Sequence, residues 1–178
     1  EFTVDMSFDQ TEIAEMLREY ELDYHTGMDV DRMAGWIFDY TSGYPVLVSR
    51  LCQLMDEVLG QKKEYEGRSA AWTQKGFHEA LRIILAEKSP LFESLIGKLK
   101  DYPELNGMLQ ALLFTGRSIV FNADEAATDM AAMFGFIKNQ NGNVAIANRI
   151  FEIRLYNYYL STSEMQKTDI YRASLQDK

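Results

Sequence analysis

A short turn and the apolar helix after it constrain this chain most. The turn covers residues 40–45 (YTSGYP), and Pro45 suits the first position of a helix, where its missing N–H costs nothing. Ser42 or Gly43 can cap the helix just before that proline. Apolar residues then recur at helical spacing as far as Leu59, and a glycine follows at a place where helices commonly end. We therefore expect a largely buried helix from Pro45 to Leu59, against which the neighbouring helices pack.

Most of the chain shows the same helical periodicity, with apolar stripes three and four residues apart. Each stripe follows a residue or run that favours a helix start: Ser7 or Asp9, Asp29, Thr73, Ser89-Pro90 and residues 101–104. Gln10 or Glu12 completes a capping box for the first of these helices. The pattern predicts about six helices before Gly116.

The period changes after Gly116. Residues 118–121 have the pattern of a short strand, and residues 124–133 that of a helix with Phe134 on its inner side and Gly135 at its C-terminal cap. Two strand-like runs, 136–138 and 144–146, then flank an Asn-Gly dipeptide, which is a strong local signal for a β-hairpin. Asn148 caps a final helix. We expect a mainly α-helical fold with one small hairpin.

The candidate domain boundary lies in residues 61–70 (QKKEYEGRSA), the most polar stretch between periodic segments. It divides the chain into residues 1–66 and 67–162. Residues 163–178 are polar and aperiodic, so we expect a C-terminal tail. Residues 1–6 alternate apolar and polar side chains, as a short strand does.

Charge argues against nucleic acid as a partner. The formal net charge is −9. Residues 1–66 hold 15 acidic and 5 basic side chains, a balance of −10, whereas residues 67–178 hold 12 and 13, a balance of +1. Because phosphate binding needs clustered Lys and Arg, the acidic half would be repelled by DNA. It suits a solvated face, which is the commoner case, or the basic surface of a partner.

Neither a membrane nor an oxidising compartment is indicated. No apolar run approaches the roughly 18 residues of a membrane span, and no signal segment opens the chain. The single cysteine, Cys52, has no partner in the chain, which fits a reducing cytosol. We expect a cytoplasmic protein. The chain begins at Glu1 without a methionine, which indicates a fragment or a processed product.

The residues for catalysis are missing from the sequence. No G-x-x-x-x-G-K-[ST] loop occurs, so nothing in the chain can cradle a triphosphate by itself. With only His25 and His78, and Cys52 expected to be buried, neither a catalytic triad nor a zinc site can be assembled. The acidic pairs Asp56-Glu57 and Asp124-Glu125 are expected to be solvated helix residues. The chain therefore offers no catalytic or metal-binding residues.

Three segments resemble parts of STAND and related AAA-like ATPases. Residues 42–48 (SGYPVLV) look like the Gly-x-Pro segment of the helical lid, where a Gly-aromatic-Pro turn precedes a hydrophobic helix and lies against the nucleotide. The resemblance continues through Ser7-Phe8-Asp9 and through residues 146–151 (IANRIF). The order helix, strand, helix, hairpin and helix also resembles the winged-helix module that often follows the lid. In this comparison residues 133–137 and 143–148 look like the short-helix end and the wing strands of that module. The order of these motifs over about residues 8–160 carries most of the resemblance.

The resemblance implies a helical lid in residues 1–66, with residues 1–6 ending a core strand, and a winged-helix domain in residues 67–162. It implies that Gly43, Tyr44 and Pro45 contact a nucleotide and that Arg50, the only basic side chain in that helix, reaches its phosphates. ATP and Mg²⁺ would bind an upstream nucleotide-binding core of the parent protein, so this chain alone would be neither an enzyme nor a cofactor carrier. A helix N-terminus does favour anions. The glycine also has a plainer explanation, since a tight turn can require positive φ.

Two functions from different classes remain open. The first is a regulatory or protein-interaction piece of a nucleotide-dependent switch, formed by the lid and the winged helix. The second is a stand-alone winged-helix module that binds DNA or protein. The helix at residues 124–133 would be the recognition helix, yet it contains Asp124, Glu125 and Asp129 and no Lys or Arg. Such a helix is poorly suited to a phosphate-lined groove, so a protein is the favoured partner.

Overall fold

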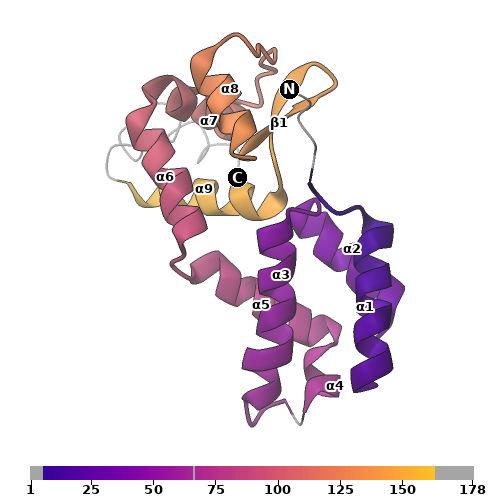
Figure 1. Cartoon of the computed structure of the whole chain (residues 1–178). Helices are drawn as coiled ribbons and strands as arrows, with labels where there is room; N and C mark the ends of the chain where they lie inside the picture. The colour runs from indigo at the N-terminus through magenta and orange to yellow at the C-terminus, as the bar shows by residue number, and fades with distance from the viewer. Residues whose placement is uncertain (1–5, 66, 163–178) are drawn as a thin grey trace. The chain divides into compact units, whose positions relative to one another are not determined.

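The computed structural model describes residues 6–65 and 67–162, and this part of the chain is mainly helical (Figure 1). Nine helices make up 69% of it, with one small two-stranded antiparallel hairpin near the C-terminal end. The predicted fold class, mainly α with a small hairpin, is therefore confirmed. The chain divides into two compact units, Glu1–Glu87 and Lys88–Lys178. Each unit has its own buried apolar residues.

The first unit begins with two capped helices, α1 (Gln10–Tyr24) and α2 (Val30–Thr41), which pack against each other. Asp9 and Glu12 form the predicted capping box, with 2.8 Å between each backbone nitrogen and the other residue's carboxylate. Asp29 caps α2, as predicted, by accepting from the backbone N–H of Arg32 at 3.2 Å. These local bonds satisfy N–H groups that would otherwise lack partners, so the start of both helices follows from short-range chemistry.

The helix predicted at Pro45–Leu59 is present but changes its winding. It runs as α3 (Pro45–Gln53), continues as a π-helical turn (Leu54–Val58) and ends in a 3₁₀ turn (Leu59–Gln61). The backbone N–H of Leu59 bonds the carbonyl of Leu54, five residues earlier, which is the wider π pattern. Tyr44 occupies the N-cap position and makes no side-chain capping bond, so the prediction that Ser42 or Gly43 caps this helix was wrong.

The predicted boundary between residues 66 and 67 falls inside the first unit. Helices α4 (Arg68–Ala71) and α5 (Gln74–Ala86) both belong to that unit. Phe77 of α5 explains why, since its ring lies 6.0 Å from the ring of Trp36 and 5.8 Å from that of Tyr40, both on α2. The polar stretch at residues 61–70 therefore connects two helices of the same unit, and the chain divides after residue 87.

The second unit contains three helices, the hairpin and a last helix. Their bounds are α6 (Pro90–Asp101), α7 (Pro103–Thr115), α8 (Ala126–Met133), β1 (Ile137–Gln140), β2 (Asn143–Ile146) and α9 (Arg149–Ser161). The strands are antiparallel, with Ile137 opposite Ile146. Asn141 and Gly142 have φ of 53° and 87°, the two positive values that a type I′ turn requires. The hairpin predicted from the Asn-Gly dipeptide is confirmed.

The segment predicted as a strand at residues 118–121 adds to the hairpin only as an isolated bridge, Val120 with Asn143. The amide of Val144 donates to the carbonyl of Ile119 at 2.8 Å, and that of Phe121 donates to Gly142 at 2.9 Å. The segment therefore lies beside β2. These bonds give the second unit a short third extended segment next to its hairpin.

One core prediction for the second unit was wrong. Phe134 is 41% exposed, although the helical spacing placed it inside. The reason is that α8 ends at Met133, so Phe134 no longer lies on the inner face of the helix. Gly135, the predicted C-terminal glycine, has φ of 75° and turns the backbone in a new direction. Phe136, which follows, is buried in its place and contacts the ring of Phe151, 5.8 Å away.

Asn148 caps α9 as predicted, accepting from the backbone N–H of Phe151 at 2.9 Å. The predicted strand at residues 1–6 falls almost wholly, and the predicted tail at 163–178 entirely, outside the described residues. No helix within residues 6–65 and 67–162 is long and apolar enough to cross a membrane.

Candidate functional site

The turn that leads into α3 is held by its own hydrogen bonds. The hydroxyl of Thr41 donates to the carbonyl of Ile37 at 2.7 Å and accepts from the amide of Gly43 at 3.1 Å. The amide of Tyr44 donates to the carbonyl of Thr41 at 2.9 Å. Ser42 and Gly43 both have positive φ, 47° and 76°. Two consecutive left-handed residues reverse the chain sharply, so the turn is a defined backbone structure.

Gly43 also lies directly against the segment before α1. The amide of Phe8 donates to the carbonyl of Gly43 at 2.9 Å. A Cβ built on Gly43 would lie 1.7 Å from the carbonyl oxygen of Phe8, far inside van der Waals contact. The structure therefore brings together two of the three segments that carried the family resemblance. It also gives Gly43 two local reasons to be glycine, the positive φ and the backbone crossing.

The start of α3 lacks the side-chain cap that most of the longer helices have. The carbonyl of Tyr44 accepts from the amides of Leu47 and Val48, both at 3.0 Å, while its side chain makes no capping bond. Pro45 removes one N–H donor from that turn. The first turn retains the positive end of the helix dipole, and Val46 beside it is 55% exposed. Burial raises the pKa of the Tyr44 phenol, which fits its half-buried position.

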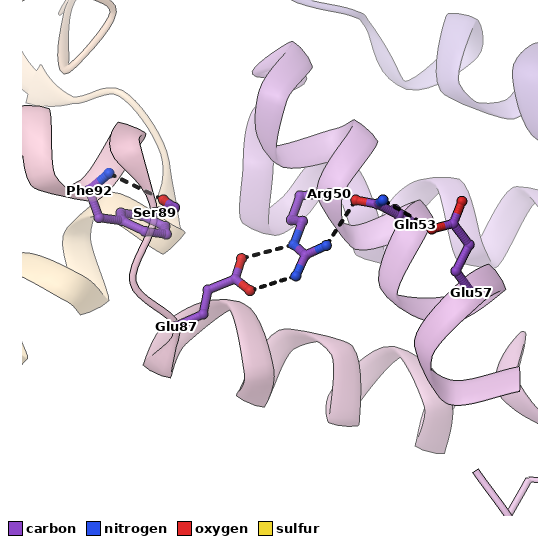
Figure 2. A network of polar contacts seen from close by, with 6 residues as sticks. All are labelled: Arg50, Gln53, Glu57, Glu87, Ser89 and Phe92. Carbon is purple, nitrogen blue, oxygen red and sulfur yellow. Dashed lines mark hydrogen bonds and ion pairs between the residues drawn. The ribbon is translucent and has the colours of Figure 1, made fainter. Parts of the chain in front are cut away.

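Arg50 is not part of the turn; it is bound elsewhere. Five residues after Pro45, it lies about 7 Å further along the helix axis. Its guanidinium grips the carboxylate of Glu87 with two bonds, Nε to Oε1 at 3.0 Å and Nη2 to Oε2 at 2.8 Å (Figure 2). The third nitrogen, Nη1, donates to Gln53 at 2.8 Å, and Gln53 in turn donates to Glu57 at 3.0 Å. The carboxylate of Glu87 raises the pKa of the Arg50 guanidinium.

The predicted site residues thus fall into two places. Gly43, Tyr44 and Pro45 share the turn, whereas Arg50 belongs to an ion pair with the end of α5. For Arg50 to hold a phosphate, its Nε and Nη2 donors would have to leave Glu87, because both already point at that carboxylate.

A second polar cluster, which the sequence did not reveal, lies around the π-helical turn. The hydroxyl of Tyr20 donates to Asp56 at 2.5 Å, and the same carboxylate oxygen accepts from Nε of Arg68 at 2.6 Å. The indole N–H of Trp72 donates to the hydroxyl of Tyr20 at 3.1 Å. The guanidinium of Arg68 lies 4.4 Å from the centre of the Tyr24 ring. This cluster ties α1, the π-helical turn and α4 together.

The cluster corrects the expectation that Asp56 is simply solvated. Its side chain is only 23% exposed and has two partners. Burial, and then the bond to Asp56, raises the pKa of Tyr20, so the hydroxyl remains a proton donor at neutral pH. No spacing rule could have found this contact, because Tyr20 and Asp56 are 36 residues apart. The arrangement acts as a structural crosslink, since Tyr20, Asp56, Arg68 and Trp72 are joined by a continuous set of hydrogen bonds.

Cys52 has the surroundings of an inert thiol. Burial raises its pKa to about 12, with a smaller contribution from the charge of Asp56. A thiol with so high a pKa carries almost no thiolate at pH 7, and the thiolate is the nucleophile. Within the described residues, no three His, Cys, Asp or Glu side chains are grouped closely enough to hold a metal ion.

An open groove of about 530 Å³ runs beside α1 and the start of α2, between Arg18, Leu22, His25 and Val30. Leu22 is 74% exposed there. Arg18 is already paired with Asp31 at 2.6 Å, and Glu21 holds the following turn by accepting from the Thr26 hydroxyl at 2.5 Å. The groove therefore presents exposed apolar side chains, and Arg18 and Glu21 at its edge already have partners.

In the second unit, α8 carries negative charge at its start. Glu125 is its N-cap and accepts from the amide of Thr128 at 2.7 Å and from that of Ala127 at 3.2 Å. Its bonds to Thr128 lower the pKa of the Glu125 carboxyl. Asp124 and Asp129 are exposed beside it. Anionic side chains thus already occupy the end of α8 at which a helix dipole would attract a phosphate.

Comparisons with known proteins add no relative. Neither a scan against models of protein families, nor a search of curated proteins, nor a search of solved structures finds a match to this chain.

Proposed function

We propose that this chain is the lid and winged-helix region of an AAA-like nucleotide-dependent switch, and that its second unit binds a protein. In this proposal the first unit closes over a nucleotide held, with Mg²⁺, by an upstream core of the parent protein. The chain itself has regulatory and interaction roles and no catalytic residues. The observation that carries the proposal is the meeting of Ser7-Phe8-Asp9 with the Gly43–Pro45 turn, through the bond from Phe8 to Gly43.

That meeting supports a lid because the two segments are the parts of the first unit that resemble the family. The turn begins α3 without a side-chain cap, so the N-terminal end of the helix dipole remains available to an anion or to the edge of a nucleotide. Tyr44 is half-buried beside it and has a ring that can stack on a base. Gly43, Tyr44 and Pro45 are therefore the nucleotide contacts of the proposal, and Arg50 is a fourth once it leaves Glu87.

The second unit supports the winged-helix part of the proposal through its element order. Two helices, a short extended segment, a helix, a hairpin and a last helix follow one another. The bonds from Val144 to Ile119 and from Phe121 to Gly142 place the extended segment beside β2, as in a three-stranded wing. In this arrangement α8 is the helix that a DNA-binding protein would insert into the major groove.

Charge favours a protein partner over DNA for this unit. Glu125 caps α8, Asp124 and Asp129 lie exposed around it, and the helix has no Lys or Arg. Non-specific affinity for DNA comes largely from neutralised phosphates, which this helix cannot provide. The alternative, a stand-alone winged helix that reads DNA, would need its cations elsewhere on the unit.

Two experiments test the proposal. For the partner class, we expect no sub-micromolar binding of duplex DNA at 150 mM salt in a fluorescence-anisotropy titration, a range in which sequence-specific readers bind tightly. Sub-micromolar affinity with a steep salt slope would establish the alternative. For the switch, the coding sequence upstream of Glu1 should contain a G-x-x-x-x-G-K-[ST] loop, and its absence from the parent protein would refute the lid assignment.

The turn itself is tested by Pro45→Ala in the parent protein. The change should weaken ATP binding, measured by calorimetry with Mg²⁺, while the chain stays folded. Glu87→Gln should strengthen ATP binding if Arg50 is a phosphate ligand, because it releases the guanidinium from its carboxylate partner. Unchanged affinity in both variants would show that the turn only starts a helix and that Arg50 only pairs with Glu87.

A further inference from the structure

We propose that the second unit pairs with a second copy of this chain through the open edge of its sheet, which is formed by residues 118–121. Inside the part of the chain that the structure describes, β2 lies between β1 and this segment, and no further strand covers the outer side of the segment. The proposal goes beyond the proposed function, because pairing between copies needs neither a nucleotide nor another protein.

The backbone of Val120 is directed away from the hairpin. Just before it, the carbonyl of Ile119 accepts from the amide of Val144 at 2.8 Å. Just after it, the amide of Phe121 donates to the carbonyl of Gly142 at 2.9 Å. Because these two groups face β2 and the residues of an extended chain alternate, the N–H and C=O of Val120 face the opposite side. No other described residue bonds either group, so the open edge offers one donor and one acceptor to another strand.

The side chain of Val120 is also uncovered, and the residue is 76% exposed. Val120 lies opposite Asn143, on the outer face of the sheet, since the next residue of β2, Val144, is buried on the inner face. The other edge of the sheet differs, because residues 138–140 (KNQ) of β1 are exposed and polar. A lysine on an edge strand discourages pairing with another chain. Pairing is therefore expected at the edge that carries the valine.

A second copy fits the open edge because the charges at its two ends complement each other. Arg117 precedes the segment and Asp124 follows it, and both are exposed. Neither side chain belongs to an ion pair among the described residues. When two copies of the edge run antiparallel, the end that carries Arg117 in one copy meets the end that carries Asp124 in the other. A two-fold axis repeats this meeting at both ends, so the edge is complementary to itself.

The free groups of Val120 also determine the register. An axis beside Val120 places it opposite the same residue of the other copy as a hydrogen-bonded pair, in which each N–H donates to the other C=O. A shift by one residue would instead oppose backbone groups of Ile119 or Phe121 that already bond β2. The two exposed valine side chains then lie beside each other and cover apolar surface. Because the shared edge is short, the association is weak and reversible.

Sedimentation velocity of the whole chain tests the pairing. The sedimentation coefficient should rise toward that of a dimer as the concentration increases from about 10 µM to about 1 mM, the range of a small interface. Val120→Lys and Val120→Glu should each remove this rise, because each places like charges directly opposite each other. An equimolar mixture of the two variants should associate again, since opposite charges then face each other across the axis.

Leu22→Lys is the matched control, because Leu22 on α1 is 74% exposed and the change introduces the same charge on the first unit. It should leave the association unchanged. Hydrogen exchange gives a second measurement on the unaltered chain. The amide of Val120 should exchange about fivefold more slowly at 1 mM than at 10 µM. The amide of Phe121, which is bonded to Gly142 in either state, should exchange at the same rate at both concentrations.

Three results would overturn the proposal. The first is a sedimentation coefficient that does not change with concentration. The second is a dimer that persists in Val120→Lys, or a mixture of the two variants that stays monomeric, since either result would place the interface elsewhere. The third is slow exchange of the Val120 amide at every concentration, which would mean that a segment of the same chain covers the edge.

Discussion

Replacing Gly43 with alanine tests how closely two backbone segments meet in the first unit. Gly43 has φ of 76°, and a Cβ at this position would lie 1.7 Å from the carbonyl oxygen of Phe8 and 2.7 Å from its carbonyl carbon. Both atoms belong to the backbone, so no side-chain rotation can relieve the clash. The segment around Phe8 would have to move by at least about 1 Å, since non-bonded heavy atoms attract only from about 3.5 Å outward.

The cost has two parts of similar size. An alanine held at positive φ costs roughly 1 kcal/mol relative to glycine. Moving Phe8 away also breaks the bond from its amide to the carbonyl of Gly43, 2.9 Å long, which contributes about 1 kcal/mol more. We expect Gly43→Ala to lower the free energy of unfolding by about 2–3 kcal/mol.

Gly27 provides a matched control. It also has φ of 76°, but no heavy atom lies within 4 Å of its Cβ position. Its amide bond to Glu21, at 2.6 Å, remains possible in alanine. Gly27→Ala should therefore cost only the backbone term, about 1 kcal/mol, so the difference between the two variants isolates the close approach to Phe8.

The assay is equilibrium unfolding in urea, followed by far-UV circular dichroism, with hydrogen exchange at the amide of Phe8. Gly43→Ala should lose more stability than Gly27→Ala and should lose protection at Phe8 as well. Equal losses in the two variants, with Phe8 still protected, would refute the reasoning, because they would mean that the crossing of the two segments contributes nothing.

Five further outcomes concern single residues. Gly76→Ala should destabilise the chain by about 2 kcal/mol, since its Cβ would lie 1.7 Å from the carbonyl of Ala71, whereas Gly97→Ala, with open space at that position, should stabilise it by about 0.5 kcal/mol in the same urea unfolding. Pro45→Ala should cost the isolated chain at most about 1 kcal/mol in thermal unfolding, because a proline at a helix start acts mainly on the unfolded state. Burial raises the pKa of Tyr159 above its ordinary value, so the neutral hydroxyl contributes fully to the free energy of unfolding below about pH 10, where unfolded tyrosine ionises. That contribution is lost as the pH rises further. Tyr159→Phe should therefore make the free energy of unfolding fall less steeply above about pH 10 in a pH series of unfolding curves. The Cys52 thiol, with a pKa of about 12, should react with Ellman's reagent at pH 8 about a thousandfold more slowly in the folded chain than in urea, and comparable rates would contradict the raised pKa.

The local features of the fold could be predicted from the sequence because short-range chemistry decides them. Asp9 with Glu12, Asp29 and Asn148 each satisfy backbone amides three residues away, so a reader of the sequence sees both partners at once. The Asn141-Gly142 turn is equally local, since its two positive φ values suit those residue types. Gly43 has the positive φ that was the plainer of the two explanations for a glycine in this turn.

Other features were decided only by tertiary packing. The sequence cannot show that Phe8 crosses Gly43, that Arg50 grips Glu87 from 37 residues away, or that Asp56 is bonded by Tyr20. Whether a charged side chain is solvated or paired depends on which helices lie beside it. Packing also places α5 in the first unit. The ring of Phe77 contacts the rings of Trp36 and Tyr40 on α2, although a polar stretch separates α5 from the helices before it in the sequence. Capping and turn chemistry act within a few residues and can be read along the chain, whereas these contacts exist only once distant segments have packed together.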